Sequence, residues 1–365
     1  MDSRPSEAPL TSAPERVDLA RHRGLILSLA LAAAGLTLCL TDTGRDQLAR
    51  LALLVGPERL RVVAARHLLT CPPRPASPVE RKAKARRIDA ALVEQVLADP
   101  SGRVRDTGLV ALESWRRPAG PEVAEPLVAM VCSGRMRDSY AAARLLRSGL
   151  FGPVGGEALQ RLLATAESDR PDLELDRRCL AIQLLGFIAP AAPTVITTLT
   201  RIVEQRGGLT ASVAAESIGY FGERSRSAIP ALRRALRARD TELRAKAAEA
   251  LGAIGPTAAP AIDELLGLLD DPESVVRVQA IRALGSIGTQ PRKVLPRLES
   301  ILCETRHVVE WQSAIISAGD FGARARSLLP VLERFAEGEL CKTELADAIR
   351  RIRESAVTTP EGSKP

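Results

Sequence analysis

A glycine that returns at a fixed interval is the feature that most constrains how this chain can fold. Five short segments share one frame: LGFI at 185–188, IGYFG at 218–222, LGAIG at 251–255, LGSIG at 284–288 and AGDFG at 318–322. Their first glycines, Gly186, Gly219, Gly252, Gly285 and Gly319, are separated by 33, 33, 33 and 34 residues. A period this regular indicates one small structural unit repeated along the chain. Two weaker copies, at 99–113 and 142–147, extend the frame toward the N-terminus.

Each period predicts two helices. In residues 275–284, apolar side chains recur at helical spacing, and we expect Gly285 to supply the conformation that ends this helix. The other helix of each period opens with a proline near its first turn, where the missing amide has no helical partner. One such pair is too small to bury both of its faces, so neighbouring pairs must stack. The sequence therefore predicts an all-α chain, an α-solenoid with a superhelical array of about seven helix pairs.

The segment VVRVQAIRALGSIG at 275–288 resembles a HEAT repeat, and its short glycine-terminated form resembles the HEAT-like repeats of phycobilisome lyases. The resemblance covers about residues 88–353. It implies a structural ladder in which an Asp between two helices and an Arg of the following helix connect neighbouring repeats. The matching residues are Asp99, Asp172 and Asp271 for the Asp, and Arg105, Arg178, Arg244 and Arg277 for the Arg. Copies with Ser139, Ala211 or Trp311 at the Arg position depart from the pattern, and the ladder is expected to be interrupted there.

A polar row three residues before the glycine frame is the candidate binding surface. Its members are Arg144, Gln183, Glu216, Glu249 and Arg282. A polar row on otherwise apolar helices must face solvent, and the HEAT resemblance implies that these helices line the concave side of the solenoid. Its mixed charge suits the polar surface of another protein. We therefore predict a scaffold or adaptor that binds a protein partner and has no catalysis of its own.

The residues that common chemistries require are missing from the sequence. No GxxxxGK[ST], GxSxG, HExxH or CxxC motif occurs, and the i, i+3 pair His307 and Glu310 is too small for a metal site. No catalytic residue, metal, cofactor or small-molecule substrate is predicted. Two alternatives stay open: a lyase-like subunit that modifies its partner, as the resemblance implies, and a nucleic-acid-binding solenoid using the basic stretch 224–246. Nucleic acid is the less favoured partner because aromatic residues, at 2%, are too few to stack on bases.

The N-terminus contains one uncharged run. Residues 24–41, GLILSLALAAAGLTLCLT, follow the basic triplet at 21–23. As a helix this run would measure about 27 Å, close to the hydrocarbon thickness of about 30 Å. The sequence therefore predicts a single-pass membrane protein whose membrane partner segment is residues 24–41. Basic residues flank both ends, so the orientation stays open. A cleaved signal peptide and a buried soluble helix are the alternatives.

Proline-rich sequence and charge suggest the remaining boundaries. Residues 71–78 contain four prolines and cannot be helical. The predicted organisation is a disordered tail at 1–20, a transmembrane helix at 21–41, juxtamembrane helices at 42–70, a Pro-rich basic linker at 71–87, the HEAT-repeat solenoid at 88–353 and a disordered tail at 354–365. The predicted function is that of a membrane-tethered scaffold.

Overall fold

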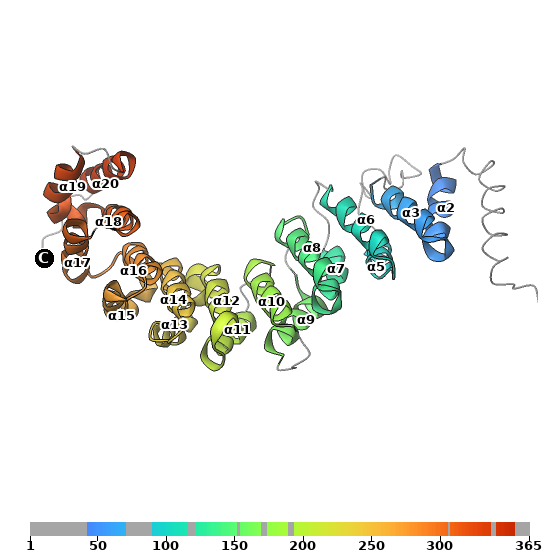
Figure 1. The fold of residues 1–365 in the computed structure, drawn as a ribbon, viewed down its shortest axis with the longest axis horizontal. Helices are drawn as coiled ribbons and strands as arrows, with labels where there is room; N and C mark the ends of the chain where they lie inside the picture. Colours follow the sequence, from blue (N-terminus) through green and yellow to red (C-terminus); the bar gives the residue numbers. More distant parts are fainter. Residues whose placement is uncertain are drawn as a thin grey trace, which may run out of the picture. The chain divides into compact units, whose positions relative to one another are not determined.

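The computed structural model describes residues 42–70, 90–114, 121–151, 154–168, 174–188, 193–305, 307–336 and 341–354 (Figure 1). These residues form helices and the turns between them, and none of them lies in a strand. The predicted all-α class is confirmed for this part of the chain. The chain divides into two compact units, residues 1–115 and 116–365, called here the N-terminal and C-terminal units.

The C-terminal unit is a stack of helix pairs. Within its described residues the pairs are α7 (Pro121–Ser133) with α8 (Met136–Arg147), α9 (Gly156–Glu167) with α10 (Leu175–Ile188), α11 (Pro193–Gln205) with α12 (Gly208–Gly219), α13 (Ile229–Ala235) with α14 (Thr241–Ile254), α15 (Ile262–Gly267) with α16 (Ser274–Ile287), α17 (Pro291–Glu304) with α18 (Val308–Asp320), and α19 (Leu329–Ala336) with α20 (Lys342–Glu354). Short 3₁₀ helices connect some of them: η1 (Gly222–Ala228), η2 (Gly255–Ala261), η3 (Leu268–Asp270) and η4 (Gly322–Leu328).

The two helices of a pair have different neighbours. We call the second helix of each pair, from α8 to α20, the frame helix, and the first, from α7 to α19, the leading helix. Each frame helix packs against its own leading helix and against the next frame helix. In α16 this buries Val276, Ile281 and Leu284, whereas Val275, which the apolar pattern placed in the core, is 45% exposed. A core shared between neighbours explains why no single pair could fold alone.

The repeat glycines serve close packing between frame helices, so the prediction that Gly285 ends its helix is wrong. Gly285 lies inside α16, and a β-carbon at this position would be 2.7 Å from the Cα of Ser317 on α18. The equivalent distances at Gly252 and Gly319 are 2.9 and 3.1 Å. The helix ends three residues later at Gly288, whose φ of 61° is the left-handed conformation that favours glycine.

The N-terminal unit contains two more helix pairs. These are α2 (Asp42–Val55) with α3 (Glu58–Thr70), and α5 (Ala90–Leu97) with α6 (Gly102–Glu113). Helix α3 packs against α6, as one frame helix packs against the next. Its sequence RVVAARHLL at 61–69 matches RVQAIRALG at 277–285. The helices predicted as juxtamembrane therefore pair and stack in the manner of the repeats, ahead of the predicted solenoid start at residue 88.

The predicted single-pass membrane localisation is contradicted. None of the helices in the described part of the chain combines the length and apolarity needed to cross a membrane. The run at 24–41 on which that prediction depended lies outside the described residues, as do the predicted tail at 1–20, the linker at 71–87 and residues 355–365.

Candidate functional site

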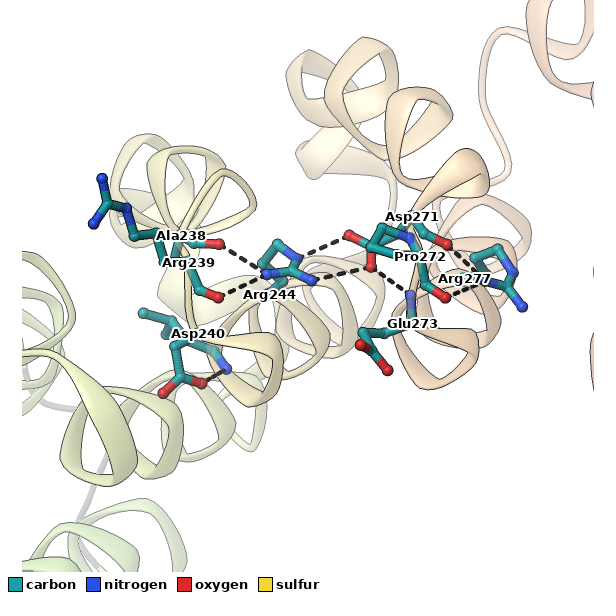
Figure 2. A network of polar contacts seen from close by, with 9 residues as sticks. Ala238, Arg239, Asp240, Arg244, Asp271, Pro272, Glu273 and Arg277 are labelled. Atoms are coloured by element: carbon teal, nitrogen blue, oxygen red, sulfur yellow. Dashed lines mark hydrogen bonds and ion pairs between the residues drawn. The ribbon is translucent and has the colours of Figure 1, made fainter.

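A chain of polar contacts connects the turn before α14 with the turn before α16 in the C-terminal unit (Figure 2). Arg244 on α14 donates from Nε and Nη2 to the two carboxylate oxygens of Asp271, at 2.8 and 3.0 Å. Asp271 also accepts the backbone amide of Glu273 at 3.0 Å. Burial alone would raise the pKa of Asp271, but the hydrogen bonds from Arg244 and Glu273 and the charge of Arg277 hold it below its ordinary value.

Arg277 carries the chain of contacts into the next repeat. It donates to the carbonyl oxygens of Asp271 and Pro272, at 2.6 and 2.9 Å, and so holds the turn before its own helix (Figure 2). Its Nη2 also lies 2.7 Å from Oε1 of Glu310 on α18. Glu310, in the first turn of α18, thus accepts from Arg277 in place of the Asp that the family pattern expects between helices, and the sequence pattern did not predict this. Its i, i+3 neighbour His307 is exposed, and the described residues include no group of side chains that could hold a metal.

The N-terminal unit contains the same arrangement. Arg61 on α3 donates to both oxygens of Asp99, at 2.8 and 3.2 Å. Arg105 donates to the carbonyl oxygens of Asp99 and Pro100, at 2.7 and 3.0 Å. Arg61 was not among the predicted residues, although the match between 61–69 and 277–285 is a signal that could have found it.

In the other repeats, the residues at the predicted ladder positions make different contacts. Arg178 reaches only the carbonyl oxygen of Ser168, at 3.4 Å, and its buried Nε has no hydrogen-bond partner. The neighbouring Arg177 is the buried one, and it donates to two carbonyl oxygens at the end of α7 and to Oγ of Ser139 at 3.2 Å. Asp172 lies outside the described residues. At the other two departures, Ala211 offers no polar atom and the Trp311 indole donates to the carbonyl of Leu302.

The two sets of helices present different surfaces. Within the described residues of the C-terminal unit, every exposed large hydrophobic side chain lies on a frame helix or at its end: Tyr140, Leu175, Phe187, Leu209, Tyr220, Val275, Val308, Val309 and Ile316. The leading helices instead carry ion pairs that join neighbours: Glu167–Arg201, Glu204–Arg234, Glu264–Arg233, Asp263–Lys293 and Asp270–Arg297. Exposed apolar groups that gather on one set of helices favour an interaction surface there.

The predicted polar row lies on the frame helices. Arg144, Glu249 and Arg282 are exposed, and Gln183 and Glu216 are half-buried. Lys246 joins two members of the row, with its Nζ 2.8 Å from Glu216 and 3.1 Å from Glu249. Burial alone would lower the pKa of Lys246, but these two carboxylates raise it above its ordinary value. That the row binds a partner stays a prediction.

An aromatic pair beside this row was missed because the row was selected by polarity. The rings of Phe187 and Tyr220 lie with centroids 4.4 Å apart, and the guanidinium of Arg147 lies 4.3 Å from the Phe187 centroid. Phe187 is 41% exposed and Tyr220 is 49% exposed. Burial raises the pKa of Tyr220 above its ordinary value, and the charge of Glu216, a member of the polar row, raises it further. Both aromatic residues directly follow a repeat glycine, a position that could have indicated them.

Comparison with known proteins identifies the repeat type. Residues 196–277 match the family model of HEAT repeats. The crystal structure of Kap121p is similar with a TM-score of 0.54 and 16% identity, over 86% of this chain and 38% of that chain. Kap121p bound to the extreme C-terminus of the protein phosphatase Cdc14p gives 0.55 and 15%, over 85% of this chain and 38% of that chain. No curated protein matches the chain.

A further solved structure, the complex of CpcE and CpcF of phycocyanin lyase from Nostoc sp. PCC7120, has 23% identity over 68% of this chain and 92% of that chain. Its TM-score is 0.43. The likeness to Kap121p concerns the fold alone, since this chain spans only 38% of that protein in the first comparison. The chain therefore carries HEAT repeats, at residues 196–277, within an all-α array of solenoid type.

Proposed function

We propose that this protein is an interaction scaffold that binds another protein through its frame helices and catalyses no reaction itself. The observation that carries the proposal is the asymmetry of the C-terminal unit, whose exposed apolar side chains all lie on the frame helices among the described residues. The leading helices have their charges joined in pairs across neighbouring repeats. A partner would therefore gain apolar contact on one face only.

The centre of the proposed surface is the cluster of Arg147, Phe187 and Tyr220. Aromatic and arginine side chains contribute most of the binding energy at many interfaces. This cluster crosses α8, α10 and α12, and the bridge from Glu216 to Lys246 continues it onto α14. A ligand lying across it would contact several repeats at once, which is how solenoids generally recognise proteins.

The nucleic-acid alternative is less well supported. Of the eight basic residues at 224–246, five make ion pairs with carboxylates: Arg233, Arg234, Arg237, Arg244 and Lys246. Charges already paired in this way release fewer counterions on meeting a phosphate backbone. A protein segment as ligand is consistent with Kap121p, which shares the fold and is bound to the extreme C-terminus of Cdc14p in one of its structures.

Site-specific photo-crosslinking tests the proposal. A photoreactive amino acid placed at Leu209 or Val275, both exposed on frame helices, is expected to capture the same partner in cells of the source organism. The matched positions Gln160 and Ser300 are exposed on the leading helices α9 and α17, and they should give no adduct with that partner. Equal capture from both sets of positions, or unrelated adducts at Leu209 and Val275, would argue against a single binding face.

A further inference from the structure

The first described helix pair presents an apolar outer face. Five of the six exposed large hydrophobic side chains in the described part of the N-terminal unit lie on α2 and α3: Leu51, Leu54, Val55, Leu60 and Val63, with exposed fractions of 49, 64, 60, 41 and 64%. The three on α2 are spaced i, i+3, i+4 and form one stripe. The opposite side of the pair is already occupied, since Leu53, Ala65 and Leu69 are at most 3% exposed.

An apolar outer face is unusual at the end of a repeat array, which generally exposes polar residues for solubility. The last described helix follows that rule. Its sequence KTELADAIRRIRE buries Leu345, Ala348 and Ile352, and places charged side chains at most of its other positions. Helices α2 and α3 also expose Arg50, Arg59 and Arg66, but unlike α20 they expose five large apolar side chains, which an apolar segment could cover.

The chain itself supplies a segment of the required chemistry at the required place. The 18 uncharged residues at 24–41 end directly before Asp42, where α2 begins. As a helix, such a run would be about 27 Å long and α2 is about 21 Å long, so the two are matched in length. Because the run ends directly before α2, its last few residues would form the turn, which leaves about 15 residues, or about 22 Å, for a helix antiparallel to α2. We propose that residues 24–41 lie against the outer face of α2 and α3 and form the N-terminal cap of the repeat array.

Two other occupants could satisfy the same apolar face: a second copy of this chain, or lipid. Each leaves a different signature. A second copy would cover the face only as protein concentration rises, and lipid would cover it only when vesicles are present. A segment of the same chain covers it at any concentration and without lipid.

Hydrogen exchange of the full-length chain in detergent-free buffer distinguishes these cases. We expect the amides of residues 24–41 to exchange about 100-fold more slowly than in an unfolded chain, with no dependence on protein concentration. The double variant L54E/V63E should abolish this protection. The control V110E places the same charge on α6 at a side chain that is also 64% exposed, and it should leave the protection intact. Unchanged exchange in α14 and α16 will show that each variant is folded.

Four results would overturn the proposal. These are rapid exchange of residues 24–41 in the unmodified chain, protection that depends on protein concentration, protection that appears only with vesicles of phosphatidylcholine and phosphatidylglycerol, and equal loss of protection in V110E and L54E/V63E. The unmodified chain alone decides the first three, so the proposal stays testable even if the double variant fails to fold.

Discussion

Replacing Asp271 with alanine is expected to lower the free energy of unfolding by about 3–5 kcal/mol, because it leaves the largely buried charge of Arg244 without its carboxylate. The side chains of Arg244 and Asp271 are only 13 and 6% exposed. The variant also removes the acceptor for the Glu273 amide at the start of α16. Urea denaturation followed by circular dichroism at pH 7 measures the loss.

The adjacent residue provides the control. Asp270 pairs with Arg297, but these side chains are 73 and 44% exposed, so Asp270→Ala should cost at most about 1 kcal/mol. The difference between Asp271→Ala and the unmodified protein should also depend on pH. Because the folded pKa of Asp271 is depressed, its contribution is present above the unfolded pKa of about 3.9 and is lost as pH falls toward the folded value. Two results would contradict a stabilising role for the Arg244–Asp271 pair. One is an equal loss of unfolding free energy in Asp271→Ala and Asp270→Ala. The other is a difference between Asp271→Ala and the unmodified protein that grows below pH 4.

Replacing Gly285 with valine is expected to destabilise the C-terminal unit by about 3 kcal/mol, since even its β-carbon would lie 2.7 Å from the backbone of α18. A helix backbone cannot move aside as a flexible side chain can. The cost should be local to the contact of α16 with α18, so hydrogen exchange should accelerate there more than in α10 and α12. Denaturation and exchange of the same variant measure both effects.

Gly267 is the matched control for this substitution. It also has helical dihedral angles, φ −64° and ψ −30°, but no atom lies within 4 Å of the position its β-carbon would take. Gly267→Val should therefore change the free energy of unfolding by less than about 0.5 kcal/mol. If Gly285→Val changed the free energy of unfolding as little as Gly267→Val, close packing between frame helices would not explain why glycine recurs at this position of each repeat.

The sequence predicted the helix pairs because their determinants are local. The apolar spacing within residues 275–284 acts within one or two turns, and so do the prolines that open α11, α13 and α19. The expectation is wrong for Pro126 and Pro296, which lie inside α7 and α17. The role of Gly285 was not predictable in this way. Gly285 and Gly288 recur with the same period, and glycine suits both a close helix contact and a left-handed cap, so only the packing of α16 on α18 separates the two roles.

Other residues were missed because their partners are distant in the sequence. Glu310 meets Arg277 across 33 residues, and it lies in the first turn of α18 rather than in the preceding turn, where the pattern expects an Asp. Arg61 precedes Arg105, the matching residue of the next helix pair, by 44 residues, and this interval differs from the regular spacing of 33 or 34 residues. Phe187 and Tyr220 are apolar enough to suggest burial, and their exposure follows from the ends of α10 and α12 lying side by side.

The affinity of the cross-linked partner for the purified chain is the most direct test of the central claim that the frame helices bind a protein. The double variant F187A/Y220A should bind at least about 30-fold more weakly, which corresponds to roughly 2 kcal/mol at an interface centre. The control R201A/R234A breaks two ion pairs on the leading helices and should stay within about threefold of the unmodified affinity. Full affinity in F187A/Y220A, or an equal loss in R201A/R234A, would contradict binding through the frame helices.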